Sequence, residues 1–120
     1  MINVKDQIYA KLQGICANVS DIYPQATSTF PAIQYTEEAN NVYTKTDKEE
    51  LATLRYRIDI WNTGSTSQLA LAVDDAISEL GLVRVSCMDV ADPRGLRQKQ
   101  MRYEGIIDVE SEMVYWEGSR

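Results

Sequence analysis

Two segments of the chain repeat apolar residues at the three- and four-residue spacing of a helix that buries one face. In the first segment, about residues 4–15, the apolar stripe consists of Val4, Ile8, Leu12 and Ile15. In the second, about residues 66–80, it consists of Leu69, Val73, Ala76, Ile77 and Leu80. Ser65 stands where a helix cap is expected, and Gly81 stands where a helix ends. The pattern therefore predicts two amphipathic helices.

Elsewhere apolar and polar residues alternate one for one, which is typical of strands that bury one face. The alternation is most regular in RYRIDIW, residues 55–61, where Tyr56, Ile58 and Ile60 fall on one side. Four strands and a short final strand or tail are predicted over about residues 32–38, 51–62, 82–90, 100–110 and 112–118. The polar segment 39–50 is predicted as a long hairpin arm or loop, and segment 92–99 as a basic turn.

The predicted elements follow the order α-β-β-α-β-β within a single domain, residues 1–120. Strands that arrive in locally joined pairs are expected to pair antiparallel. We therefore expect an α+β fold, a two-layer sandwich of a mainly antiparallel four- to five-stranded sheet with two helices on one face. The opposite face of the sheet would carry Arg55, Arg57, Asp59, Arg102, Glu104 and Asp108.

Composition excludes several classes of function. The formal charge of −6 argues against a dedicated nucleic-acid binder, which presents a basic face to phosphates. The apolar runs are far shorter than the ~20 residues that cross a bilayer, and Lys5 and Asp6 stand where a secretory signal would be apolar. Neither a membrane role nor a signal peptide is expected. Cys16 and Cys87 are expected to be buried, reduced thiols, although a disulfide between them stays open.

The sequence shows no pattern that carries catalytic chemistry. It contains no histidine, the commonest general base and a frequent metal ligand. The segment NTGSTS, residues 62–67, lacks the second glycine and the lysine of a phosphate-binding loop. Adjacent Asp74 and Asp75 would point about 100° apart on a helix, which suits a solvated face better than a metal site. We therefore predict no catalytic residue, no metal and no cofactor, and expect that the protein is not an enzyme.

The charged side of strand 55–61 is the most informative surface of the predicted fold. Arginine, tryptophan and tyrosine are enriched at the energetic centres of protein interfaces. The residues on this side are therefore predicted to face another protein chain: Arg55, Arg57, Asp59 and Trp61. The alternative is a solvated sheet face on which arginines pair with carboxylates across strands.

The order of several stretches resembles the tail-completion, or tail-terminator, proteins of long-tailed bacteriophages and prophages. The stretches that carry the resemblance are IYP (22–24), FPAIQY (30–35), RYRIDIW (55–61), SQLALAVDDAISEL (67–80) and MRYEGIIDV (101–109). Together they span nearly the entire chain in the order found in that family. None of them is a catalytic signature.

The resemblance implies a non-enzymatic structural protein with a similar α+β fold. Such a protein forms a ring, a hexamer, on the head-proximal end of the tail tube, ends tube polymerisation and presents a surface for head joining. The implied partners are further copies of itself, the tail tube protein and the head connector protein, with DNA only in passage through the ring and no membrane. The implied location is the virion tail, and the host cytoplasm during assembly.

Two segments are candidate contact regions within this hypothesis, and both are expected to be loose in the free protein and ordered on the tube or the connector. Segment 39–50 contains Tyr43, Lys45 and Lys48, and segment 92–99 contains Arg94, Arg97 and Lys99. Two other functions remain open. One is a head–tail connector adaptor or stopper of the neck. The other is a small cytosolic ligand-binding or enzymatic α+β domain, which would need a closed pocket with convergent polar groups.

Overall fold

The computed structural model describes residues 4–21, 30–45, 50–91, 95–108 and 113–114, with side chains for all of these except 42–45, 50, 107–108 and 113–114. In chain order the elements are α1 (Lys5–Gln13), β1 (Val19–Ser20), β2 (Ala32–Lys45), β3 (Glu50–Asn62), α2 (Ser67–Ser78), β4 (Val83–Ala91), β5 (Arg97–Asp108) and β6 (Met113–Val114).

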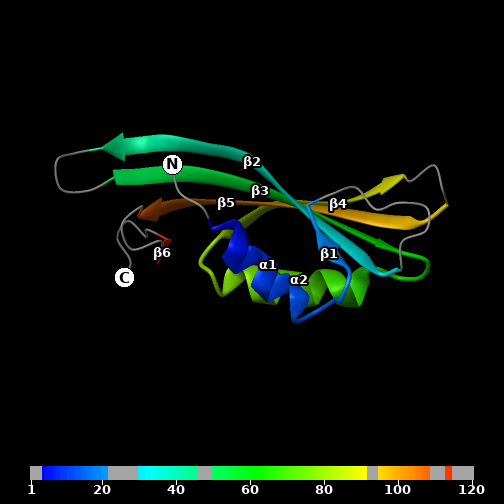
Figure 1. Ribbon diagram of the computed structural model, residues 1–120. Coiled ribbons are helices and arrows are strands. Elements are labelled where there is room, and N and C mark those ends of the chain that lie inside the picture. The colour runs from blue at the N-terminus through cyan, green and yellow to red at the C-terminus, as the bar shows by residue number, and fades with distance from the viewer. Residues whose placement is uncertain (1–3, 22–29, 46–49, 92–94, 109–112, 115–120) are drawn as a thin grey trace.

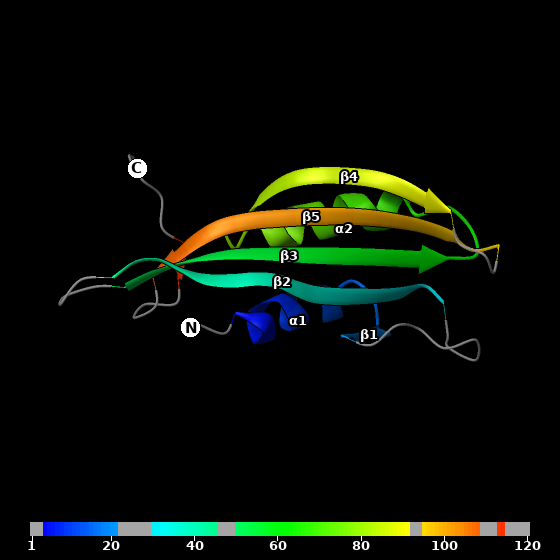
Figure 2. The same cartoon turned by 90° about the horizontal axis from the view of Figure 1, so that it is seen from above.

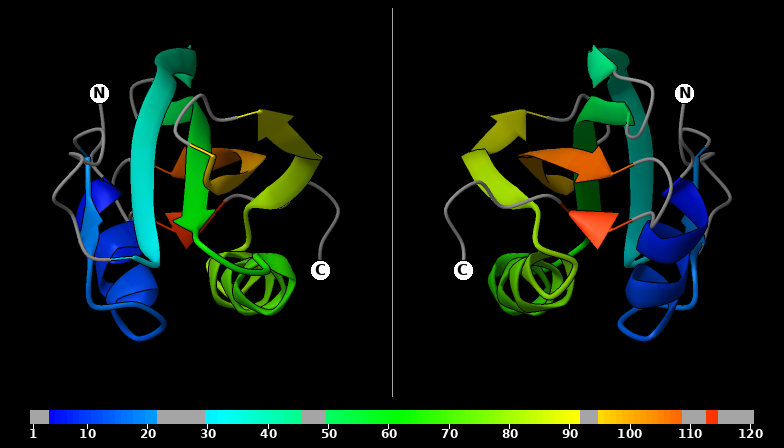
Figure 3. Two further views of the ribbon diagram at one scale, coloured as in Figure 1. Left: turned by 90° about the vertical axis from the view of Figure 1, so that its right-hand side faces the viewer. Right: turned by 90° about the vertical axis from the view of Figure 1, so that its left-hand side faces the viewer.

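One sheet and two helices form the two layers of the fold. The strands lie in the order β1-β2-β3-β5-β4, and the short β6 pairs with β5. Both helices pack beneath the same face of the sheet, with α1 under β2 and α2 under the β5–β4 side (Figures 1 and 3). The predicted α+β sandwich with two helices on one face is confirmed.

Strand pairing follows the predicted local pairs. β2 pairs antiparallel with β3, and β4 pairs antiparallel with β5. The two hairpins join through antiparallel β3 and β5, which makes β3 the central strand. The parallel pairing of β1 with β2 was not predicted, because a two-residue strand is too short to show an alternating pattern.

The strand bounds differ from the prediction at two places. Residues 39–45, predicted as part of a long hairpin arm or loop, form the hairpin arm and continue β2, whereas residues 97–99, predicted as part of a turn, begin β5. Both segments hydrogen-bond to β3 through the backbone, with two irregularities of register in β2. Backbone pairing with a long neighbouring strand does not require apolar side chains, so polar composition was a poor guide to these ends.

The helix ends agree with the predicted signals. The Ser65 hydroxyl accepts a hydrogen bond from the backbone N–H of Ser67 at 3.2 Å, at the start of α2. Gly81 follows α2 with a φ of 91°, in the left-handed region that favours glycine. Val4, Ile8 and Leu12 of the predicted first stripe are buried.

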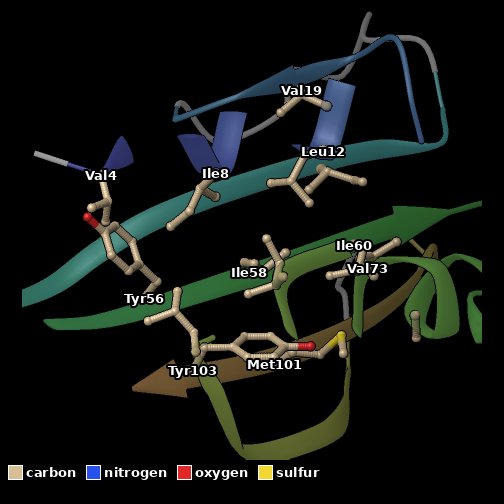
Figure 4. Close-up of a cluster of buried hydrophobic side chains, with 14 of the residues drawn as sticks. Val4, Ile8, Leu12, Val19, Tyr56, Ile58, Ile60, Val73, Met101 and Tyr103 are labelled. Atoms are coloured by element: carbon tan, nitrogen blue, oxygen red, sulfur yellow. The ribbon is translucent and has the colours of Figure 1, made fainter. Parts of the chain in front are cut away.

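The core lies between the helices and the lower face of the sheet (Figure 4). The side chains of Tyr56, Ile58 and Ile60 in β3 are fully buried, as the alternation predicted. The cluster also includes residues of α1, α2 and β5, among them Ile8, Leu12, Val73, Ile77, Met101 and Tyr103. The central strand therefore contacts both helices through one row of side chains.

The two cysteines have different surroundings. Cys16 is buried, whereas Cys87 is exposed on β4, and neither forms a disulfide. The expectation of two buried thiols is wrong for Cys87. β4 is an edge strand, so its side chains are less covered by the helix layer than those of β3.

Two buried tyrosines each donate a hydrogen bond from the phenolic hydroxyl to a carboxylate. The Tyr56 hydroxyl donates to Glu37 Oε1 at 2.6 Å, and the Tyr103 hydroxyl donates to Asp74 Oδ1 at 2.8 Å. Burial raises the pKa of both phenols well above the ordinary value, and the neighbouring carboxylates raise it further. Each phenol is therefore held in its protonated form in the folded chain.

These raised pKa values predict a loss of stability in alkali. Above a pH of about 10 the unfolded chain releases the two phenolic protons while the folded chain retains them, so the free energy of unfolding falls as pH rises. The expected slope is up to about 1.4 kcal/mol per pH unit for each phenol. Urea unfolding at several pH values between 7 and 11.5 measures this slope. The variants Tyr56→Phe and Tyr103→Phe should each reduce it, and an unchanged slope in both would contradict the assignment.

Candidate protein-interaction surface

The upper face of the sheet lies opposite the helices (Figure 2), and the register places the predicted charged residues of strand 55–61 beside those of β5. The register places Arg55 opposite Glu104, Arg57 opposite Arg102 and Asp59 opposite Gln100 on β3 and β5. The face predicted from the alternation is therefore present. The register also places Asp108 in β5, opposite Leu51.

Asp59 is the centre of a polar network on this face. Its carboxylate accepts hydrogen bonds from Arg57 Nε at 2.9 Å, Gln98 Nε2 at 3.2 Å and Gln100 Nε2 at 3.1 Å. Only 2% of Asp59 is exposed. A carboxylate so far from water is stable when its oxygens are hydrogen-bonded and a cation lies beside it. The cation Arg57 and the amides of Gln98 and Gln100 supply these contacts from within the same sheet.

A second carboxylate links β2 to the same network. Glu38 accepts from Arg102 Nε at 3.0 Å and lies 3.5 Å from Arg57 Nη1. Arg55 and Glu104 form a separate pair between β3 and β5, nearer the solvent, with Arg55 Nε at 2.7 Å from the carboxylate. Arginines of this face therefore pair with carboxylates across strands, as the solvated-face alternative expected.

The network changes what each predicted residue offers to a partner. Arg55 is exposed, whereas Arg57 and Asp59 are bound to one another. Trp61 lies in β3 with only 1% of its surface exposed, so its ring is not displayed on the surface. The prediction that this face contacts another protein stays a prediction.

The residues predicted in the two polar segments separate into two groups. Tyr43 and Lys45 belong to β2, at the end of the sheet where β2 joins β3, and Lys48 lies outside the described residues. Arg97 and Lys99 begin β5 at the opposite end of the sheet, and Arg94 lies outside the described residues (Figures 1 and 2). Lys99 forms an ion pair with Asp89 of β4 at 3.3 Å.

A cavity of about 300 Å³ lies beside the first turn of α2 and includes two of these residues. Its lining contains Ser65, Thr66 and Ser67 from α2 and the residues before it, and Arg97 and Lys99 from β5. Among the described residues no group of three acidic or cysteine side chains could hold a metal ion. Within the same part of the chain no helix is long and apolar enough to cross a membrane.

Sequence reasoning missed the exposure of β4. Val83 is 50% exposed, and Val85 and Met88 are each 48% exposed. The segment VRVSCMDVA is rich in apolar residues and was interpreted as an ordinary half-buried strand. The sequence held one signal of this exposure, because apolar residues occur on both sides of the strand. A strand with one solvated face usually carries polar residues on that face.

β4 and β2 are the two long strands whose outer edges have no long partner. β4 ends the strand order, and β1 covers only Ile33 and Gln34 of the fourteen-residue β2. In the described part of the chain, no further strand pairs with either edge. Exposed edges offer unpaired backbone donors and acceptors to another chain.

Comparison with known proteins gives a family and a similar fold. The family model described as "Tail completion protein gp17" matches residues 5–111. Among solved structures, a chain in the structure entitled "Virion of native gene transfer agent (GTA) particle" is similar to this one, with a TM-score of 0.57 and 12% sequence identity. The similarity covers 84% of this chain and 91% of that chain, and it concerns the fold. A search of curated proteins finds no match.

The network on the upper face predicts different costs for removing two of its carboxylates. Asp59→Ala removes the acceptor of two half-buried glutamine amides and one of the two carboxylate partners of Arg57, so we expect a loss of about 1–3 kcal/mol in the free energy of unfolding. Glu104→Ala removes one member of a partly exposed pair and should cost less than about 1 kcal/mol. Urea denaturation at neutral pH measures both values. Equal costs would show that the network does not hold the strands in register.

Proposed function

Since the chain belongs to the tail completion protein gp17 family, as the match over residues 5–111 shows, we propose that it is the terminator of a phage tail tube. In this role it binds the head-proximal end of the tube, ends polymerisation and forms the surface to which the head joins. The observation that carries the proposal is the family match over most of the chain, and the α+β fold with its two open sheet edges is consistent with it.

A terminator must bind the last ring of the tube without becoming a template for another tube ring. A subunit that binds its neighbours sideways, through two different surfaces repeated round an axis, closes into a ring and leaves no growing end. Each contact in such a ring should bury about 800 Å² per partner to be stable. Two open edges on opposite sides of one sheet provide the two different surfaces that a hexameric ring requires.

The elongated shape suits two further partners. The molecule measures 51 × 25 × 24 Å, and the β2–β3 end and the β4–β5 end lie at opposite ends of the sheet (Figure 2). Lys45 lies at the end of β2, and Arg97 lies at the start of β5, at the opposite end of the sheet. In the proposal, one end contacts the tail tube protein and the other contacts the head connector protein. Separate ends allow the two partners to bind without competing.

The charge of the chain is consistent with DNA that only passes through the ring. The formal net charge of −6 disfavours condensation on phosphates, so a genome leaving the head would slide rather than bind. In this function the protein acts in the virion tail after assembly in the host cytoplasm. It needs no cofactor and catalyses no reaction.

Deleting the protein from a producing strain tests the proposal against the adaptor or stopper alternative. A terminator is required to end tube growth, so its loss should give tubes longer than those of the parent strain, by electron microscopy of purified tails. Expression of the chain from a plasmid should restore the parental length. Tails of normal length that fail to join heads would instead assign the chain to the neck as an adaptor or stopper.

Charge reversal at the two ends of the sheet tests whether they contact different partners. We expect Lys45→Glu and Arg97→Glu to impair different steps, because each reverses a charge at only one end of the sheet. One variant should give overlong tubes, and the other should give tails of normal length that lack heads. Circular dichroism of the purified variants controls for folding. The same defect from both, or parental tails from both, would contradict two separate contact ends.

A further inference from the structure

The outer edge of β4 is open along its nine residues. They include neither lysine nor proline, which often block strand addition, although they include Arg84, Asp89 and a register irregularity between Arg84 and Ser86. Three of its exposed side chains are apolar: Val83, Val85 and Met88. An open edge with exposed apolar side chains is a site to which another strand can add.

The second open edge lies on the opposite side of the sheet. β1 pairs with β2 only at Ile33 and Gln34, so residues 35–45 have an outer edge that no described strand covers. This free stretch of β2 is long enough to pair with the whole of β4. The described side chains along it are polar or small, and they include Glu38 and Asn41.

We propose that the outer edge of β4 pairs antiparallel with residues 35–45 of β2 in a second copy of this chain, and that this contact closes the ring. The partner is therefore the next subunit, bound head to tail through backbone hydrogen bonds. The apolar side chains of β4 lie at the seam. This inference rests on the proposed ring-forming function, and it identifies the two surfaces by which the ring is held together.

The direction of the strands agrees with rotational symmetry. The sequence β2, β3, β5, β4 across the sheet alternates in direction at every step, because each neighbouring pair is antiparallel. With four alternating strands per subunit, β4 runs opposite to β2. A neighbour related by rotation about the ring axis therefore presents its β2 in the direction that antiparallel pairing with β4 requires. With an odd number of alternating strands, the same contact between rotated subunits would be parallel.

The stagger between the two edges agrees with a closed ring. The register places Cys87, Met101, Ile58 and Tyr35 in one row across the four strands. Asn40, the midpoint of the free part of β2, pairs with Leu54, four residues along β3 from Ile58. Figure 2 shows this free part displaced along the sheet from β4.

That displacement can be converted into a strand tilt. Four to five residues span about 13–17 Å along a strand, and four strand spacings span about 19 Å across the sheet. If the midpoint of β4 faces the midpoint of the free part of the neighbouring β2, each strand leans about 35–40° from the ring axis. Strands of closed barrels lean by about 35–45°. With this pairing, the offset between the two edges gives a tilt within the range found in closed barrels.

Disulfide cross-linking tests the pairing directly, since the chain already carries an exposed thiol at the midpoint of β4. Cysteines placed singly at Ala39, Asn40 and Asn41 should bring at least one thiol opposite Cys87 of the next subunit. Directly opposed residues lie 4.5–5.5 Å apart between Cα atoms, within the range that a disulfide spans. Mild oxidation of tails assembled from these variants should give a ladder of oligomers up to the full ring on non-reducing gels.

Two matched variants control the cross-linking. Adding Cys87→Ser to each variant should abolish the ladder of oligomers. A cysteine at the exposed position Gln13 in α1 (Gln13→Cys) should give no ladder. Tails of parental length without a ladder from any β2 cysteine would overturn the edge pairing while leaving the terminator function standing. Disulfide dimers formed by the unmodified chain through Cys87 alone would also overturn it, because they would show β4 paired with β4.

A charge on the β4 edge gives an independent test. Met88→Lys places a lysine, which blocks strand addition, on the β4 edge. Because the Met88 side chain is already half-exposed, the fold should persist while the ring fails to close. We expect at least a tenfold loss of tails of parental length. Leu71→Lys on α2, where the side chain is 67% exposed, is the control and should behave as the parent. Parental tails from Met88→Lys would contradict the proposal.

Discussion

The pairing of β3 with a long strand on each side is the constraint on which the rest of the molecule depends. β3 is joined to β2 and β5 along nearly its whole length, so every side chain of Glu50–Asn62 has a set face and a set neighbour. A slip of one residue would turn the buried Tyr56, Ile58 and Ile60 toward the upper face and the charged row toward the helices. One register therefore determines the core and the charged face together.

The polar contacts hold this register from both faces. Above the sheet, Asp59 is bound by Arg57 and by two glutamines of β5. Below it, the hydroxyl groups of Tyr56 and Tyr103 reach carboxylates on β2 and α2. Asp59, Tyr56 and Tyr103 are buried, so each contact would be costly to lose in an alternative register. These polar groups therefore contribute to the structure of the sheet.

The proposed function depends on what surrounds this central strand. The arginines of the upper face are largely occupied by carboxylates of the same chain, whereas the outer edges of β4 and β2 leave backbone groups unpaired by any described strand. A protein that works by assembly needs such unsatisfied, directional surfaces, and it needs two different ones to form a ring. The fold and the family agree on an assembly role in a phage tail.

The sequence by itself determined the two helices, the four long strands, the antiparallel pairs and the alternation that separates the core from the charged face. These follow from local periodicity and from short connections, both of which can be detected along the chain. The burial of Trp61, the continuation of β2 through residues 39–45 and the exposure of β4 were decided only by the tertiary structure. Each depends on which strand lies beside which. The order of strands in a sheet is a long-range property that the periodicity of a single strand does not contain.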